Sequence, residues 1–266
     1  MNDIAPLSTL DFEQVRQLAQ ASCGIHLAEG KRAFVSSRLE RLVRRHGFRS
    51  FSEYIRFVST RRHGAEFTEF VDTLTTNHSG FWREPEHFLF LQRNVFPTHR
   101  SRLRIWSAAC ATGEEPYTIA MCALDAGIAS CNVTASDISR AALAAAMAGE
   151  YEASKLSQLP AGWPDRWFQR LKNKPESVRA VAPAIRALVN FRPLNLLESF
   201  AHLGEFDVIF CRNVMIYFSQ DTRDQLVEKL AERLVPGGYL FTGHSETLLR
   251  LPRALDYVQS ATYKKR

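Results

Sequence analysis

The sequence predicts an α/β protein in which a Rossmann-like domain with a small inserted subdomain follows an all-α domain. Apolar residues repeat at helical spacing in the first part of the chain, whereas strand and helix patterns alternate in the rest. A group of prolines interrupts that alternation before it resumes. We therefore expect a helical domain over residues 1–80 and an α/β domain over residues 81–266, with the insertion at about residues 154–187.

The expected helical domain contains several helical segments. In the first, the apolar residues are three or four positions apart, as on one face of a helix; they are Phe12, Val15, Leu18 and Ala19. A second helix is expected at about residues 31–46, because Gly47 can adopt the left-handed conformation that commonly ends a helix. Further helices are expected at about residues 52–60 and 65–75.

The second domain alternates short apolar runs with helical patterns. The expected strands are residues 103–107, 133–136, 206–210 and 239–242, and the expected helices are residues 115–126, 140–148 and 221–235. Strands and helices that alternate at this spacing form a doubly wound, largely parallel sheet. Because such sheets bind ligands beyond the carboxyl ends of their strands, the residues that follow the strands are the candidate site.

The composition excludes several classes of protein. The chain contains no run of about 18 apolar residues, and its start lacks the pattern of a secretory signal, so we expect a cytoplasmic protein. The five cysteines show no Cys-x-x-Cys spacing and the eight histidines form no His-x-x-x-His pair, so neither a disulfide framework nor a metal site is expected. The net charge of +6 favours an acidic partner.

The loop after the first expected strand has features of a ligand-binding turn. Its small residues allow a ligand to approach the backbone, Gly113 permits a tight turn, and Pro116 fits the first turn of the next helix. The pattern differs from Gly-x-Gly-x-x-Gly, and Glu114 and Glu115 would repel a pyrophosphate. They suit a positively charged ligand such as S-adenosylmethionine, which has an ammonium and a sulfonium. The alternative is an ordinary strand-to-helix loop, where carboxylates favour the helix N-terminus.

Polar residues follow two further expected strands. Asp137 lies 24 positions after Gly113, close to the spacing at which an acidic residue binds a ribose diol. The alternative for Asp137 is a cap on the following helix. Asn213 follows the strand at residues 206–210 and suits a ligand's ammonium or amide, and Tyr217 lies four residues further on. A capping asparagine and a core tyrosine are the alternatives for these two residues.

Four segments of the chain form a pattern in a fixed order: TTNHSGFWRE at residues 75–84, WSAACATGEEPY at 106–117, CRNVMIYF at 211–218 and GHSE at 243–246. They resemble the signature blocks of CheR-type chemotaxis receptor methyltransferases, and the resemblance covers most of the chain. It implies a class I, S-adenosylmethionine-dependent protein-glutamate O-methyltransferase. Such an enzyme methylates glutamate side chains of chemoreceptors for sensory adaptation and releases S-adenosylhomocysteine.

The resemblance also implies roles for individual residues. The implied cofactor pocket consists of Asn77, Ser79, Arg83, Glu115, Asp137, Asn195, Leu196, Asn213 and Val214. Asp137 would hold the ribose, and Glu115 and Arg83 would lie toward the methionine end. Arg83 and Tyr217 would border the transferred methyl group and the incoming carboxylate, as the catalytic residues. Ser79 stands where the family has a threonine, which keeps the hydroxyl group.

The expected second helix offers a docking face for an acidic partner. Residues 31–62 contain ten Lys or Arg and two acids. One face of the helix is apolar, and the other carries Arg38, Arg41, Arg44 and Arg45. The resemblance implies that this helix reads glutamate-rich cytoplasmic helices of chemoreceptors, so we expect association with membrane receptor arrays without insertion into the membrane. A solvated charged face is the alternative.

The residues 171–173 depart from the family pattern. Family members that dock on a C-terminal receptor pentapeptide carry a Gly-x-Gly turn in the inserted subdomain, and Leu171-Lys172-Asn173 lacks it. Tethering through that pentapeptide is therefore doubtful for this chain.

Two other classes of function compete with a receptor methyltransferase. A nucleic-acid methyltransferase would explain the basic charge, but the Asn/Asp-Pro-Pro-aromatic motif of amino-methylating enzymes is missing after residues 206–210. Against a non-catalytic, cofactor-sensing module, Arg83, Asp137, Asn213 and Tyr217 are all intact. No nucleic-acid partner is therefore expected.

Overall fold

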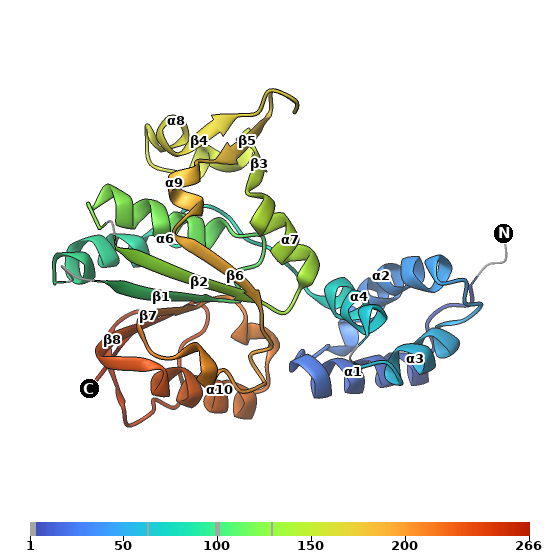
Figure 1. Cartoon of the computed structure of the whole chain (residues 1–266). Coiled ribbons are helices and arrows are strands. Elements are labelled where there is room, and N and C mark those ends of the chain that lie inside the picture. Colours follow the sequence, from blue (N-terminus) through green and yellow to red (C-terminus); the bar gives the residue numbers. More distant parts are fainter. Residues whose placement is uncertain (1–3, 63, 99–101, 129) are drawn as a thin grey trace.

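The amino-terminal part of the chain forms a helical domain (Figure 1). A computed structural model describes residues 4–62, 64–98, 102–128 and 130–266. The helices of this domain are α1 (Thr9–Cys23), α2 (Arg32–Arg45), α3 (Phe51–Ser59) and α4 (Ala65–Leu74), with a 3-10 turn η1 (Glu29–Lys31) before α2. The last three helices agree with the predicted segments to within one residue. The apolar faces of all four helices enclose one core, which includes Phe12, Val15, Val35, Leu39, Tyr54 and Phe70.

The ends of these helices are determined by local side chains and glycines. The Oγ atom of Ser8 accepts a hydrogen bond from the backbone N–H of Asp11 at 3.0 Å, which begins α1. Gly24 ends α1 with φ +73°. Gly47 follows α2 at the same φ of +73°, as its position in the sequence predicts. Only glycine adopts this conformation without a steric cost.

The second domain is built on a seven-stranded, mostly parallel sheet. In spatial order the strands are β6 (Val189–Pro193), β2 (Cys131–Asp137), β1 (Leu103–Ala108), β7 (Phe206–Cys211), β8 (Leu234–Thr242), β10 (Thr262–Lys265) and β9 (Leu255–Gln259). The first five are parallel, and β10 is antiparallel to both of its neighbours. The carboxyl ends of β2, β1, β7 and β8 therefore lie along one edge of the sheet.

Helices cover both faces of this sheet (Figure 1). Helices α6 (Glu114–Asp125) and α7 (Arg140–Ala148) lie on one face, and α10 (Gln220–Glu232) lies on the other. Alternate residues of a strand point to opposite faces, so Ile105 and Phe210 join one core while Trp106 and Ile209 join the other. This two-sided burial explains why the strands read as continuous apolar runs in the sequence.

The inserted subdomain contains a small antiparallel sheet of its own. Its strands are β3 (Glu150–Glu152), β5 (Val178–Val181) and β4 (Phe168–Arg170), in that spatial order, together with α8 (Trp163–Trp167) and α9 (Pro183–Arg186). The small sheet begins at Glu150, a few residues before the predicted start of the insertion. The remaining short elements are α5 (Pro85–Phe90), η2 (Leu91–Val95), η3 (Phe96–Thr98), η4 (Ala153–Gln158), η5 (Ala201–Leu203) and η6 (Met215–Tyr217).

The helical domain contacts the sheet domain close to the carboxyl ends of the strands. The backbone N–H of His26 donates to the carbonyl of Tyr217 at 2.7 Å, and the Nδ2 atom of Asn195 donates to the carbonyl of Ser22 at 2.7 Å. Contacts between α4 and α7 join the two domains at a second place. Within the described part of the chain, no helix combines the length and the apolar character needed to cross a membrane.

Candidate active site

A cavity lies where the helical domain meets the carboxyl ends of β1, β2 and β7. Its lining includes all ten residues predicted for the cofactor and the catalytic pair, namely Asn77, Ser79, Arg83, Glu115, Asp137, Asn195, Leu196, Asn213, Val214 and Tyr217. The helical domain contributes Cys23 and Ile25, which sequence reasoning missed. No spacing pattern marks these two residues, because only the folded interface brings them to the cavity.

Asp137 ends β2 and binds two backbone groups. Its Oδ2 atom accepts from the N–H of Ala111 and its Oδ1 atom accepts from the N–H of Ser139, both at 2.8 Å. The side chain that caps α7 is Ser139, whose Oγ accepts from the N–H of Ala142 at 3.1 Å. The alternative in which Asp137 caps this helix is therefore wrong. Burial raises the pKa of Asp137, and the two N–H donors offset this only in part.

The loop between β1 and α6 has a strained, compact backbone. Ala109 and Ala111 have φ of +62° and +47°, and Gly113 has φ +94°. A Cβ atom on Gly113 would lie 2.8 Å from Cβ of Ala146 and 3.0 Å from the hydroxyl of Tyr151, so only glycine fits. The small side chains leave the backbone of Ala109 and Ala111 in the cavity lining, as the sequence predicts.

The two neighbouring glutamates of this loop have different roles. Glu115 lines the cavity, whereas the side chain of Glu114 is fully buried and pairs with Lys155 at 2.8 Å. The expectation that both carboxylates suit a positive ligand is therefore wrong for Glu114. On a helix, neighbouring residues point about 100° apart, which separates the two carboxylates.

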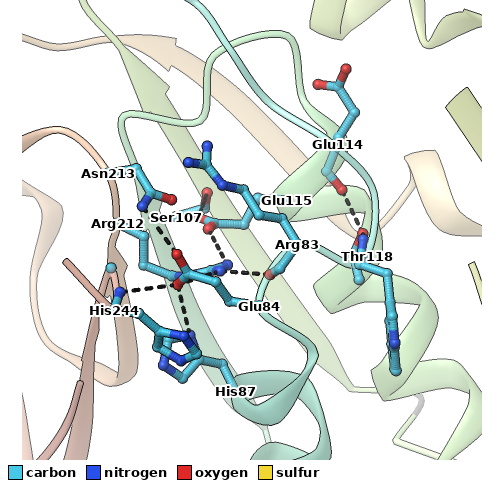
Figure 2. A network of polar contacts seen from close by, with 12 residues as sticks. Arg83, Glu84, His87, Ser107, Glu114, Glu115, Thr118, Arg212, Asn213 and His244 are labelled. Atoms are coloured by element: carbon cyan, nitrogen blue, oxygen red, sulfur yellow. Dashed lines mark hydrogen bonds and ion pairs between the residues drawn. The ribbon is translucent and has the colours of Figure 1, made fainter. Parts of the chain in front are cut away.

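A buried arginine of the cavity lining, Arg212, is part of a network of polar contacts (Figure 2). The side chain of Arg212 is 2% exposed; its Nη2 atom donates to Glu84 at 2.9 Å and to the carbonyl of Arg83 at 2.6 Å, and its Nη1 atom donates to Glu115 at 2.9 Å. Burial raises the pKa of Glu115, and Arg212 and Ser107 offset this only in part. Burial also opposes the ionisation of Glu84, but Arg212 and Asn213 outweigh it and lower the pKa.

Arg212 and Glu84 were not among the predicted site residues. Both lie inside the signature segments, and a charged residue that directly follows a buried strand, as Arg212 does, is a signal for such a role. Because Arg212 holds the carbonyl of Arg83 and the carboxylate of Glu115, it determines where these two cavity residues lie.

Glu84, His87 and His244 are close enough together to be compared with a metal site. Their potential ligand atoms lie within 4.8 Å of one another. However, Oε1 of Glu84 accepts from Asn213, and Oε2 accepts from Arg212 and from the backbone N–H of His244 (Figure 2). A cation would have to displace a guanidinium that is already paired, so we assign no metal here. The absence of a metal site stays a prediction.

Asn213 and Tyr217 lie at the carboxyl end of β7. The Nδ2 atom of Asn213 donates to Glu84 at 3.1 Å, which leaves its Oδ1 atom available to accept from a ligand. The short helix η6 has no side-chain cap, so the capping alternative for Asn213 is wrong. Tyr217 ends η6 and is half-buried; it packs against the core around Trp106 and also lines the cavity, so the core alternative and a place at the site both hold for this residue.

Two family models match this chain. The CheR methyltransferase all-alpha domain matches residues 10–75, and the CheR methyltransferase SAM binding domain matches residues 77–264. The chain belongs to the CheR methyltransferase family. The family assignment agrees with the two-domain fold and with the order of the four signature segments.

Named relatives of this CheR chain cover nearly its whole length. Chemotaxis protein methyltransferase 1 of Pseudomonas aeruginosa is 39% identical over 94% of each chain. Chemotaxis protein methyltransferase Cher2 of Pseudomonas putida is 39% identical over 94% of each chain. The chemotaxis protein methyltransferase of Borreliella burgdorferi is 38% identical over 96% of this chain and 94% of the relative.

The cavity of this CheR protein fits S-adenosylmethionine, the cofactor of the matched domain. Two carboxylates, Glu115 and Asp137, line it, and each oxygen of Asp137 keeps a lone pair beyond its single backbone bond. Apolar groups such as Ile25, Leu196 and Val214 line the rest. A ligand that combines positive charge, a diol and an apolar surface matches this set of groups.

Three of the four arginines on the predicted docking face of α2 already bind other groups of the helical domain. The Nη1 atom of Arg38 donates to the carbonyls of Thr73 and Thr75 at 2.9 and 2.7 Å, so Arg38 stabilises the end of α4. Arg44 pairs with Glu40 at 2.6 Å and Arg45 pairs with Glu69. Arg41 is exposed and makes no hydrogen bond or ion pair with any described residue. The expectation of a free face is wrong for Arg38.

Proposed function

We propose that this protein transfers a methyl group from S-adenosylmethionine to glutamate side chains of chemotaxis receptors, giving glutamate 5-O-methyl esters and S-adenosylhomocysteine for sensory adaptation. The observation that carries this proposal is the cavity at the strand ends, which is lined by all ten residues that the family resemblance assigns to the cofactor and the acceptor. The names of relatives at 38–39% identity support the receptor as the substrate.

The reaction needs alignment rather than a general base. A glutamate carboxylate has an unperturbed pKa of about 4.3, so it is already ionised near neutral pH. When bound, S-adenosylmethionine supplies an electrophilic methyl group. The protein must hold the carboxylate in line with that group and remove its water, a form of catalysis worth roughly 7–11 kcal/mol in favourable cases. This explains why the described residues need no Ser-His-Asp set.

Arg83 and Tyr217 are the proposed catalytic residues. Arg83 is fixed through its own carbonyl by Arg212 and through its Nη1 atom by the carbonyl of His78 at 3.1 Å. Its guanidinium can donate to the incoming carboxylate. The hydroxyl of Tyr217 makes no hydrogen bond with any described residue, so it can donate to the same carboxylate. Both groups would orient the nucleophile without being consumed.

The remaining cavity residues are the proposed cofactor ligands. Asp137 would accept from the ribose, and Glu115 would lie at the methionine end. Asn213 would accept through Oδ1, because its Nδ2 atom is engaged by Glu84. Asn77, Ser79, Asn195, Leu196 and Val214 would complete the pocket.

Receptor docking is assigned to the helical domain. We propose residues 1–80 as the docking domain and residues 81–266 as the methyltransferase domain, with about 154–187 as its insertion. Arg41 is the best placed docking residue. The exposed side chains of Arg44 and Arg45 could exchange their glutamate partners for receptor glutamates, since ion pairs at the surface contribute little. The partner would be the glutamate-rich cytoplasmic helices of a receptor, with the protein at the receptor array.

The loop that joins β4 to β5 supports docking without the receptor pentapeptide. It spans residues 171–177, includes Lys172 and Lys174, and contains no glycine. The Gly-x-Gly turn of pentapeptide-dependent family members is therefore absent from this hairpin. We propose that the α2 face is the main contact with the receptor.

The decisive experiment is transfer of radiolabelled methyl from S-adenosylmethionine to receptor-containing membranes, followed by mild alkali. Label released as volatile methanol is expected, because a carboxyl methyl ester is labile to alkali. The Asp137→Asn variant should reduce transfer by at least tenfold through weaker cofactor binding. Alkali-stable label, or label only in added nucleic acid, would refute the proposal and favour the nucleic-acid alternative.

A further inference from the structure

The fourth signature segment, residues 243–246, ends in a buried carboxylate to which the proposed function gives no role. Glu246 is 2% exposed and binds three backbone N–H groups. Its Oε2 atom accepts from Asn213 at 2.6 Å and from Gly243 at 2.8 Å, and its Oε1 atom accepts from Ile216 at 3.1 Å. One side chain therefore binds the loop after β8 to the loop after β7.

We propose that Glu246 is a positioning residue that holds Asn213 and Tyr217 at the edge of the cavity. The inference rests on the proposed function, in which Asn213 contacts the cofactor and Tyr217 contacts the acceptor. Glu246 does not line the cavity itself, so it acts through the loop.

The loop after β7 needs an external restraint. Asn213 has φ +58°, a left-handed conformation that costs a non-glycine residue energy. The short helix η6 that follows it has no side-chain cap, and a single turn is not stable alone. Glu246 binds the N–H of Asn213 on one side of this turn and the N–H of Ile216 within it. Charge-assisted bonds of this kind are stronger than neutral ones.

Close packing of the two loops supports the same conclusion. A Cβ atom on Gly243 would lie 2.5 Å from Nδ2 of Asn213 and 2.7 Å from Oε2 of Glu246. Gly243 is therefore required for Glu246 to reach Asn213. The strained φ values of Ala109, Ala111 and Asn213 belong to residues that line the same cavity, which is typical of backbone held in place for function.

The test uses Glu246→Gln, Gly243→Ala and the control Asp207→Asn in the full chain. An amide at position 246 keeps the shape but turns one acceptor into a donor that faces an N–H group. Asp207 lies near the opposite end of β7 and accepts from the backbone N–H of Arg104 at 2.7 Å. The Asp207 variant thus neutralises a carboxylate that binds a backbone N–H group far from the cavity. Each variant is measured for S-adenosylmethionine affinity by calorimetry, for kcat and KM with receptor membranes, and for Tm.

We expect E246Q and G243A each to weaken S-adenosylmethionine binding by roughly tenfold. The kcat at saturating cofactor should fall as well, because Tyr217 moves with the loop, while the KM for receptor changes little. The double variant should lose less S-adenosylmethionine binding free energy than the two single variants together, since both substitutions disrupt the same contact. D207N should keep the affinity and the kcat of the wild type even where its Tm falls.

Wild-type affinity and kcat in both E246Q and G243A would overturn the inference. The inference would also be overturned if D207N and E246Q lost equal cofactor affinity and kcat at an equal fall in Tm. Glu246 would then contribute only to the stability of the fold. If E246Q does not fold, G243A is compared with D207N in cofactor affinity, kcat and Tm instead. A wild-type chain that binds the cofactor but gives no alkali-labile label would overturn the proposed function. The role of Glu246 in cofactor binding could still be tested by the S-adenosylmethionine affinities of the variants.

Discussion

At the scale of single residues, the charged groups of the site bind one another as well as the cavity. Arg212 is paired with Glu84 and Glu115, and all three side chains are mostly shielded from water. Such a buried set contributes little net stability, because desolvation offsets the attraction, but the loss of one member is costly. We infer that its value lies in the fixed positions of Arg83 and Glu115 rather than in stability.

His87 is a buried histidine next to this set of charged residues. Its side chain is fully buried, and neither ring nitrogen has a hydrogen-bond partner among the described residues. Burial and the neighbouring charge of Arg212 lower its pKa from 6.5 to about 3, against the opposing effect of Glu84, and His244 lowers it further. The folded protein therefore holds His87 neutral at every pH at which it is expected to work.

This neutral histidine predicts a loss of stability in mild acid. Below the unfolded pKa of 6.5 the unfolded chain binds a proton at His87 that the folded chain does not bind until about pH 3. The free energy of unfolding should therefore fall by about 1.4 kcal/mol per pH unit as the pH drops through this window. His87→Leu should remove this contribution, as measured by urea unfolding at several pH values.

The control for the histidine experiment is His202→Leu, since His202 is exposed. The His202 variant should follow the wild-type pH profile. Parallel profiles for wild type and His87→Leu would show that His87 is not held neutral.

At the scale of secondary-structure elements, α2 serves two purposes with one row of arginines. Arg38 binds the carbonyls that end α4 and also lies over the ring of Phe34 at 4.1 Å, so it belongs to the packing of the helical domain. Arg41 lies one turn further along and has no such contact. The helical repeat puts both on one face, and only the position of α4 distinguishes them.

The two arginines should respond differently to substitution. Arg38→Ala should lower the free energy of unfolding by about 1.5–3 kcal/mol, the range for hydrogen bonds to charged groups, as measured by urea unfolding. Arg41→Glu should change stability by less than about 0.5 kcal/mol. It should slow receptor methylation by roughly threefold to tenfold at unchanged cofactor affinity, because reversed charge opposes an acidic partner.

Reversal of Arg93, an exposed residue of η2 in the sheet domain, is the matched control for Arg41→Glu. Arg93→Glu should leave methylation unchanged. Equal effects of the two reversals would indicate a general charge effect, and no effect of Arg41→Glu would assign α2 to the solvated surface.

At the scale of the whole molecule, the cavity exists only because two domains meet. Gly24 ends α1 between Cys23 and Ile25, which both line the cavity. A Cβ atom on Gly24 would lie 3.1 Å from Leu197 and 3.2 Å from Phe218, side chains of the other domain. The end of α1 therefore packs directly against the loops that carry the cofactor residues.

Gly24→Ala and Gly47→Ala form a matched pair that isolates this contact. Both glycines have φ +73°, but a Cβ atom on Gly47 would meet nothing within 4 Å. Each substitution should cost about 1 kcal/mol of stability from backbone strain. Gly24→Ala should cost more and should also weaken S-adenosylmethionine binding, as measured by urea unfolding and calorimetry. Equal behaviour of the two variants would contradict a role for the interdomain contact in binding.

Much of the fold and of the site could be predicted from local patterns. The helices from α2 to α4 and the strands β1, β2 and β7 lie close to where periodicity predicts them, because each has a continuous apolar pattern. The prediction for β8 is wrong at its start, since this strand begins at Leu234, within the predicted helix 221–235 and ahead of the predicted strand 239–242. The small sheet of the inserted subdomain could not be predicted, since its strands have only three or four residues. A pattern that short does not distinguish a strand from a loop.

The sequence by itself determined the fold class, the four signature segments and ten of the residues that line the cavity. The tertiary structure decided which of two adjacent glutamates faces the ligand, which arginine of α2 is free, and which groups fix Arg83 and Asn213. It also assigned partners to Arg212 and Glu246, some of which lie as far as 129 and 33 positions away along the chain, respectively. Local patterns report the burial of one element at a time, whereas a polar side chain is defined by the partner that folding brings to it.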